Sequence, residues 1–171
     1  MSDYAEELRQ IVTDAAAELR LLPEDAAARS PAPGKWSVKE IIGHLIDSAS
    51  NNHQRFVRAQ FRADLRFEGY DQDEWVRTQR YQNAPWADLV GLWELFNLHL
   101  ARFMTAVPDD VRLRDRADHN LDRLAWHAVA AHETTTLDYF MRDYVEHLKH
   151  HLRQVDELRA GSRARVSIPS S

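Results

Sequence analysis

The sequence predicts an all-α protein folded as a four-helix bundle. Glycine and proline are scarce, with 5 and 6 among 171 residues, so few residues interrupt helices. Four long segments carry apolar residues at intervals of three and four positions, which is the pattern of a helix that buries one face. No segment alternates apolar and polar residues as a half-buried strand does. Long helices that each bury one apolar stripe pack side by side in a bundle.

The first predicted helix covers residues 3–20, and the second covers roughly residues 37–62. In the first helix Leu8 and Val12 share one face, and Pro23 follows as a stop. The second helix begins with a capping box, in which the side chains of Ser37 and Glu40 each satisfy the other residue's backbone N–H. Its apolar stripe consists of Val38, Ile41, Ile42, Leu45, Ala49 and Phe56.

The third and fourth predicted helices are flanked by irregular sequence. Residues 63–84 show no sustained period and are predicted to form a long loop that carries aromatic residues. Residues 109–134 are predicted to be irregular, with a short helix near 120–130. The fourth helix runs from about Thr135 to Arg159, before Gly161. The third helix follows Pro85 and ends by Pro108, and its inward residues are Leu89, Leu92, Trp93, Phe96, Leu100 and Phe103.

The length and composition fit one soluble domain, expected over residues 1–160, with a flexible tail at 161–171. The two long connections allow crossovers, so the order of the helices in the bundle stays open. A net charge of −5 argues against nucleic-acid binding, and no apolar run is long enough to span a membrane. The acidic N-terminus is unlike a signal peptide, so a cytoplasmic protein is expected. Without cysteine, disulfides, thiolate metal ligands and a cysteine nucleophile are excluded.

Three histidines lie close together in the fourth predicted helix, within the segment HLKHHLRQVDEL. His147 and His151 are four positions apart and share a face beside the apolar stripe, whereas His150 is predicted to point toward solvent. Such a pair can hold a metal ion, although in a chain with nine histidines it can also arise by chance as two partly buried side chains. His44, on the polar flank of the second helix, is the candidate third ligand. The remaining histidines are weaker candidates: His53, His99, His119, His127 and His132.

The segments KWSVKEIIGHLIDS, YDQDEW and TLDYFMRDYVEHLKHHLRQV resemble the DinB-like superfamily and, within it, the YfiT-type proteins. The resemblance extends over roughly residues 35–158. It implies a four-helix bundle, often dimeric, in which three histidines hold a divalent metal, most often zinc or nickel. By position these are His44, His147 and His151. Many members carry a doubled histidine in the second-helix motif, where this chain has Gly43 and then His44, and the residues before the fourth helix match no pattern of the family.

Some proteins of this family transfer low-molecular-weight thiols, and others are described as metal-dependent hydrolases. A divalent ion held by three imidazoles can lower the pKa of bound water from 15.7 toward about 7, or bind a thiol as thiolate. The leading hypothesis is therefore a transferase that activates a small-molecule thiol for attack on an electrophilic co-substrate. A hydrolase that uses water, or a non-catalytic metal-binding stress-response protein, are the alternatives. The partners expected are these small molecules and a second copy of the chain in a homodimer, with no nucleic acid and no membrane.

Other polar and aromatic residues are candidates for supporting roles around the metal. Residues that could orient the imidazoles, or be ordinary surface residues, are Asp47, Asn51 and Gln154. Residues of the long loop that could close over the site, or pack on the bundle, are Tyr70, Asp71 and Trp75. Trp36 is expected to plug the entrance of the second helix.

Overall fold

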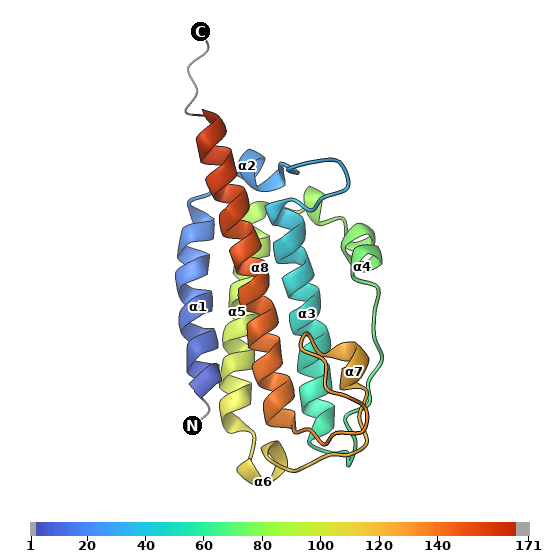
Figure 1. Ribbon diagram of the computed structural model, residues 1–171. Coiled ribbons are helices and arrows are strands. Elements are labelled where there is room, and N and C mark those ends of the chain that lie inside the picture. The colour runs from blue at the N-terminus through green and yellow to red at the C-terminus, as the bar shows by residue number, and fades with distance from the viewer. Residues whose placement is uncertain (1–2, 167–171) are drawn as a thin grey trace.

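The computed structural model describes residues 3–166, with side chains through Gly161, and contains four long helices (Figure 1). They are α1 (Asp3–Arg20), α3 (Val38–Ala59), α5 (Trp86–Ala106) and α8 (Leu137–Val166). The connections contain short helices: α2 (Glu24–Ala28), α4 (Gln72–Gln79), the 3-10 helix η1 (Tyr81–Asn83), α6 (Asp109–Arg112) and α7 (Leu121–Leu124). The predicted all-α four-helix bundle is confirmed.

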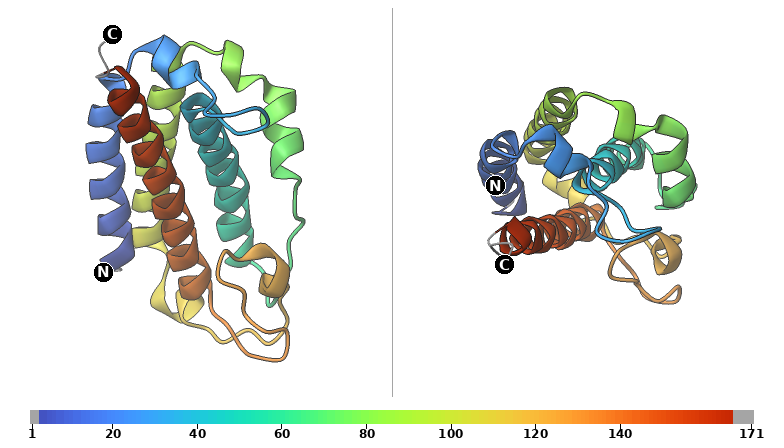
Figure 2. Two further views of the ribbon diagram at one scale, coloured as in Figure 1. Left: turned by 45° about the horizontal axis from the view of Figure 1, so that its top comes forward. Right: turned by 90° about the horizontal axis from the view of Figure 1, so that it is seen from above.

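The four long helices surround one core in the order α1, α5, α3, α8. Helix α1 packs against α5 and α8, and α3 packs against the same two helices, as the view along the bundle shows (Figure 2). Helices α1 and α8 run in one direction and α3 and α5 run in the other (Figure 1). Since α3 and α5 are parallel, the chain between them must travel the length of the bundle. Residues 60–85 do this along the outer side of α3.

Helix α3 has the start that the sequence predicts. The side chain of Ser37 accepts a hydrogen bond from the backbone N–H of Glu40, and the Glu40 carboxylate accepts one from the N–H of Ser37 at 2.8 Å. This capping box fixes the first turn of α3, and therefore the rotational setting of the helix. The inward face, which includes Leu45 and Phe56, is completely buried. The opposite flank of the same helix carries His44, also buried, toward α8.

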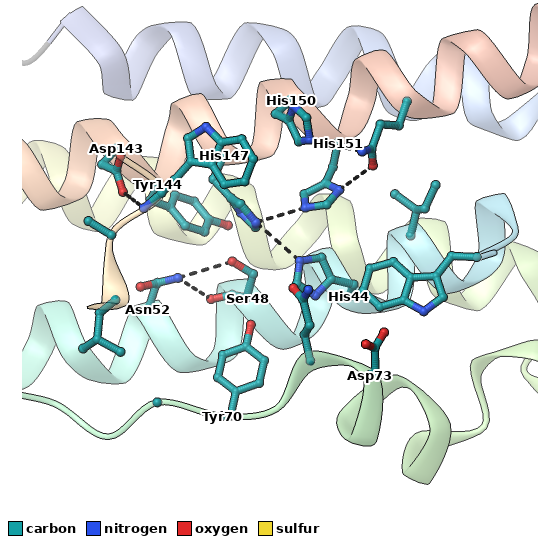
Figure 3. Close-up of a pocket in the computed structure, with 18 of the residues that line it drawn as sticks. His44, Ser48, Asn52, Tyr70, Asp73, Asp143, Tyr144, His147, His150 and His151 are labelled. Atoms are coloured by element: carbon teal, nitrogen blue, oxygen red, sulfur yellow. Dashed lines mark hydrogen bonds between the residues drawn. The ribbon is translucent and has the colours of Figure 1, made fainter. Parts of the chain in front are cut away.

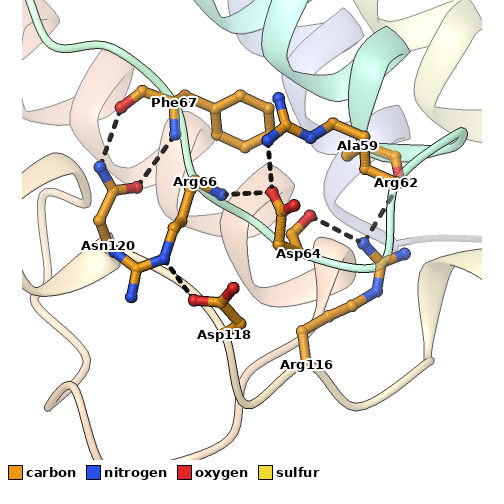
Figure 4. A network of polar contacts seen from close by, with 8 residues as sticks. All are labelled: Ala59, Arg62, Asp64, Arg66, Phe67, Arg116, Asp118 and Asn120. Carbon is orange, nitrogen blue, oxygen red and sulfur yellow. Dashed lines mark hydrogen bonds and ion pairs between the residues drawn. The ribbon is translucent and has the colours of Figure 1, made fainter.

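A polar network joins the two long connections at the far end of α3 (Figure 4). The buried guanidinium of Arg116 donates to the backbone carbonyls of Ala59, Asp64 and Val111 at 3.2–3.4 Å. The side-chain amide of Asn120 bonds both the N–H and the carbonyl of Phe67. The network therefore gives a backbone carbonyl in the last turn of α3 a hydrogen-bond donor. It also joins the segment after α3 to the segment before α8.

The structure corrects several predictions about the elements. Residues 63–84 are not a plain loop, because Asp71 caps α4 by accepting from the N–H of Glu74 at 2.9 Å and Val76 anchors that helix in the core. Leu92, predicted to face inward, is 52% exposed, since α5 meets its neighbours through the faces beside it. Among the described residues, no helix is long and apolar enough to cross a membrane.

The fourth long helix extends further than predicted. Helix α8 passes Arg159 and Gly161 and ends at Val166. A glycine costs a helix about 1 kcal/mol relative to alanine but keeps its N–H donor, so it does not by itself end the helix. Residues 161–166 of the predicted flexible tail are therefore helical, and its remainder, 167–171, lies outside the described residues. The assignment of residues 1–160 to one domain stays a prediction.

Candidate metal centre

Three imidazoles from two helices meet beside a cavity (Figure 3). His147 and His151 lie one helical turn apart on α8, and His44 faces them from α3. The Nε2 atom of His147 is 3.0 Å from Nε2 of His151 and 3.4 Å from Nε2 of His44. One ring nitrogen from each side chain lies within 4.8 Å of the other two. This spacing allows all three nitrogens to bind one ion.

The three imidazoles are uncharged in this environment. Burial and, to a smaller extent, the neighbouring imidazoles lower the pKa of His44 and of His147 to about 3. Burial also lowers the pKa of His151. At neutral pH the rings therefore carry lone pairs directed at a common region, which is the protonation state that binds a metal. Among the described residues, no carboxylate joins this group. The donor set is thus three neutral nitrogens, which suits zinc, nickel and similar ions.

Gln154 orients one of the three rings. Its Oε1 atom lies 2.8 Å from Nδ1 of His151, so Nδ1–H donates and Nε2 is left with its lone pair toward the cluster. The amide nitrogen of Gln154 lies 3.1 Å from Nε2 of His150. Gln154 therefore contacts a member of the cluster, as the sequence suggested.

The other two polar candidates do not contact the imidazoles. The Asp47 carboxylate accepts hydrogen bonds from the Tyr81 hydroxyl at 2.6 Å and from Gln79. Asn51 donates to the backbone carbonyl of Asp47 at 2.9 Å. Asp47 is directed away because η1 and α4, which the sequence did not predict, pack against this part of α3. The Nδ1 atom of His44 is buried and has no hydrogen-bond partner.

The cavity beside the three histidines has a volume of about 840 Å³. It is large enough for a small-molecule ligand. The ring of Trp36 lies 5.1 Å from that of His44, so this residue packs directly on the cluster at the start of α3. The residues that line the cavity along α3 are Ile41, His44, Ser48, Asn52 and Arg55, and the last four of these are polar.

Of the three predicted rim residues, Tyr70 lines the cavity. Burial raises the pKa of its hydroxyl to about 12. Asp71 and Trp75 are not among the lining residues: Asp71 caps α4, and the ring of Trp75 packs 4.9 Å from that of Tyr70. These two residues therefore support the wall of the cavity from behind.

Sequence reasoning missed the part of the wall formed by the segment before α8. The buried carboxylate of Asp143 accepts from the backbone N–H groups of Trp126 and His127 at 2.7 and 2.8 Å, and lies 3.0 Å from Nδ1 of His127. It holds this segment against α8, where the Trp126 ring lies 4.4 Å from that of His150 and 5.6 Å from that of His147. His150 thus lines the cavity under Trp126 instead of pointing to solvent. The available signal was Asp143 itself, one turn before His147 on the same face.

Gly43 explains one departure from the motif of the family. A Cβ atom at this position would overlap the ring of Tyr81. The space beside α3 that a second histidine would need is therefore filled by an aromatic side chain, whose hydroxyl bonds Asp47. In this chain the cluster has one histidine from α3.

Comparisons with known proteins identify a family and similar chains. The profile of the DinB superfamily matches residues 7–155. A similar protein of Bacillus subtilis (strain 168), named "Putative metal-dependent hydrolase YfiT", is 28% identical over 126 residues, which are 73% of this chain and 65% of that protein. The match thus spans less than two thirds of its length. The solved structure of YfiT, described as a probable metal-dependent hydrolase with an unusual four-helix bundle topology, has a TM-score of 0.69 at 20% identity and covers 92% of this chain and 87% of that one.

Proposed function

The chain belongs to the DinB superfamily, and from that premise we propose that it is a metal-dependent enzyme whose divalent ion is held by His44, His147 and His151. Zinc and nickel are the ions that the resemblance to the family implies, and imidazole ligands suit both of them, as they suit copper and iron. The observation that carries the proposal is the convergence of three neutral ring nitrogens within 4.8 Å at the edge of a cavity. When bound, the ion supplies Lewis acidity that makes a thiol or water nucleophilic at neutral pH.

A small-molecule thiol is the nucleophile that the surrounding residues favour. Hydrolysis at a metal site commonly uses a protein carboxylate as general base. Among the described residues, no carboxylate hydrogen-bonds to the three imidazoles. Of the acids that line the cavity, Asp143 is occupied by three N–H groups of residues 126 and 127, and Asp73 and Glu157 are exposed. A thiol needs no such base, because its proton is already acidic enough to leave on metal binding. The chain has no cysteine, so the sulfur comes from the substrate. The proposed reaction is transfer of this thiol to an electrophile.

Hydrolysis is the second candidate, and the relatives favour it. Both the similar protein from Bacillus subtilis and the solved structure carry the description of a metal-dependent hydrolase. The same three histidines would serve, with water in place of the thiol. The two reactions differ in one requirement that can be measured: the hydrolase turns over esters or amides without added thiol.

The test begins with metal content. Untagged protein is purified and its metals are measured by elemental analysis, beside the triple variant His44→Gln, His147→Gln, His151→Gln. The matched control is His132→Gln, which changes an exposed histidine of the irregular segment. About one ion per chain is expected in the wild type and the control, and none in the triple variant.

Activity then separates the candidates. Metal-loaded protein is assayed with a panel of thiols and a chlorinated nitroarene, and separately with activated esters without thiol. Acceleration that needs thiol and is lost in the triple variant supports the transferase. Ester turnover without thiol supports the hydrolase instead. Metal binding with neither activity would overturn the enzyme proposal and leave a non-catalytic metal-binding protein.

A further inference from the structure

A buried positive charge without a counter-ion lies in the same cavity as the three histidines. Arg55 is only 7% exposed and lines the cavity. Its guanidinium donates to the side-chain oxygen of Asn52 at 3.3 Å and to the backbone carbonyl of Glu68 at 2.6 Å, and it lies 5.9 Å from the centre of the Tyr70 ring. No carboxylate among the described residues forms an ion pair with it. Removing a charge from water without a partner is costly, so this arrangement calls for an explanation.

Other buried cations of the chain show what a purely structural role looks like. The ammonium of Lys39 pairs with the Glu24 carboxylate at 2.7 Å and also bonds two backbone carbonyls. The guanidinium of Arg116 donates to three backbone carbonyls through its terminal nitrogens and, unlike that of Arg55, does not line the cavity; its buried Nε has no hydrogen-bond partner. A guanidinium has five N–H donors, and the bonds of Arg55 use two of them. The other donors of this cavity-lining side chain are therefore available to a ligand.

Arg55 ends a row of polar side chains that begins at the histidine cluster. His44, Ser48, Asn52 and Arg55 follow one another at steps of four, four and three positions, so they share one face of α3, and all line the cavity. The ends of the row are about 16 Å apart along the helix axis. The bond from Arg55 to Asn52 directs the guanidinium back toward the cluster and shortens this span. Figure 3 shows Ser48 and then Asn52 following His44 along α3.

The surroundings of Arg55 suit an anion. Tyr70, the aromatic neighbour of its guanidinium, keeps its proton because burial raises its pKa to about 12, so this ring does not oppose a negative ligand. The carboxylate of Asp143, the buried acid among the lining residues, is bonded to the segment at Trp126. Of the buried charged groups that line this cavity, the one available to bind a ligand is therefore the positively charged guanidinium of Arg55.

We propose that Arg55 binds the carboxylate of an elongated small-molecule substrate whose other end reaches the three histidines. The planar guanidinium matches a carboxylate with two parallel hydrogen bonds. Ser48 and Asn52 contact the middle of the molecule. This proposal rests on the proposed function for the identity of the reacting end, and the anion site itself rests on Arg55 alone.

The experiment uses a pair of probes that differ only in charge, hexanoate and hexanamide, titrated into the full-length protein by calorimetry. The variants are Arg55→Gln and Arg55→Lys, and the matched control is Arg58→Gln, which removes an exposed arginine from the next turn of the same helix, outside the cavity. A fourth protein, His147→Gln, removes one histidine of the cluster. Thermal melts establish that each variant is folded.

Wild-type protein is expected to bind hexanoate at least about tenfold more tightly than hexanamide. Arg55→Gln abolishes this preference and Arg55→Lys retains part of it, because lysine keeps the charge but not the planar pair of donors. The preference remains in Arg58→Gln and in His147→Gln.

Equal binding of the two probes by the wild type would overturn the proposal, as would a preference that survives Arg55→Gln. Loss of the preference in His147→Gln but not in Arg55→Gln would place the carboxylate on the metal and would also overturn it. If Arg55→Gln fails to fold, the preference of the wild type for hexanoate over hexanamide, and its reduction in Arg55→Lys, still test the proposal. The calorimetric comparison needs neither a bound metal nor turnover. Its result therefore tests the carboxylate site even if the proposed enzyme activity is not found.

Discussion

Glycine at position 43 leaves the space that the ring of Tyr81 fills against α3. Replacing Gly43 with alanine is expected to force these groups apart and to lower the free energy of unfolding by about 1–3 kcal/mol, as overpacking of a core does. Urea denaturation measures this change. The control is Gly91→Ala on α5, where a Cβ atom meets open space. That substitution is expected to stabilise the protein by up to about 1 kcal/mol, since alanine is the better helix former. Equal effects at both positions would contradict the assignment of Tyr81 to this space.

The buried carboxyl of Asp47 makes stability depend on pH. Burial raises its pKa above the ordinary value, and hydrogen bonds from Tyr81 and Gln79 offset part of this. Between the ordinary pKa and the raised pKa the folded protein holds a proton that the unfolded chain has lost, so this residue favours folding as the pH falls through that range. As the pH rises to neutral, the contribution disappears.

The substitution Asp47→Asn tests this sign. The variant is expected to be more stable relative to the wild type at about pH 7.5 than at about pH 4.5, by urea denaturation at each pH. The exposed Asp14→Asn on α1 is the comparison. A wild-type advantage that grows toward neutral pH would show that the charged form of Asp47 stabilises the fold.

At the scale of single residues, the sequence predicted which side chains share a helix face but not what covers them. The 100° step of a helix brought His147 and His151 to one side and His44 to the facing flank, and the structure places all three together. Their role as metal ligands stays a proposal. The prediction for His150 was wrong because Trp126 comes from a segment without periodicity. Arg55 lies on the same polar flank of α3 as His44, and its lack of a counter-ion appears only in three dimensions.

Among the elements, the wall that contains Trp126 depends on one carboxylate. Asp143→Asn leaves an amide whose NH₂ group cannot accept the N–H bonds now made to the second oxygen. Residues 125–128 are expected to exchange backbone amide hydrogens faster, while the exchange of α3 and α5 is unchanged. Hydrogen exchange followed by mass spectrometry measures both, with the exposed Asp122→Asn as the control. Unchanged exchange in residues 125–128 would show that Asp143 does not hold this segment.

Long helices were predictable and short ones were not. Helices α1, α3 and α5 have apolar stripes long enough to show their period, and the capping box located the start of α3. Helix α4 covers only Gln72–Gln79 and buries Val76 alone, so its sequence shows no stripe. Helix α4 is stabilised by the Asp71 cap and by packing against α3. The packing is a tertiary contact, which the local sequence does not reveal. The overlooked signal was the cap followed by two acidic residues.

For the whole molecule, metal binding is expected to raise thermal stability. The histidines belong to two helices, with His44 and His147 separated by 103 positions, so an ion bound by all three exists only in the folded state. Ligand at about 100 times its dissociation constant stabilises a protein by about 2.7 kcal/mol. Zinc or nickel should therefore raise the melting temperature of wild type and His132→Gln, and a chelator should reverse this. An equal rise in His147→Gln would show that the ion binds elsewhere.

The path of the chain between the helices was not predictable from the sequence. Connections of the lengths seen at 60–85 and 107–136 permit more than one arrangement, and the parallel pair α3 and α5 follows from contacts such as those of Arg116 and Asn120 with distant carbonyls and amides (Figure 4). The homodimer and the cytoplasmic location stay predictions.

The chain order of the three histidines has a consequence for biosynthesis. During translation His44 leaves the ribosome with α3, whereas His147 and His151 follow only with the last long helix. A nascent chain that stops after α5 has a single imidazole of the cluster and so cannot coordinate an ion through all three. An ion could thus bind to all three histidines only after the last long helix has been synthesised and has packed against the others.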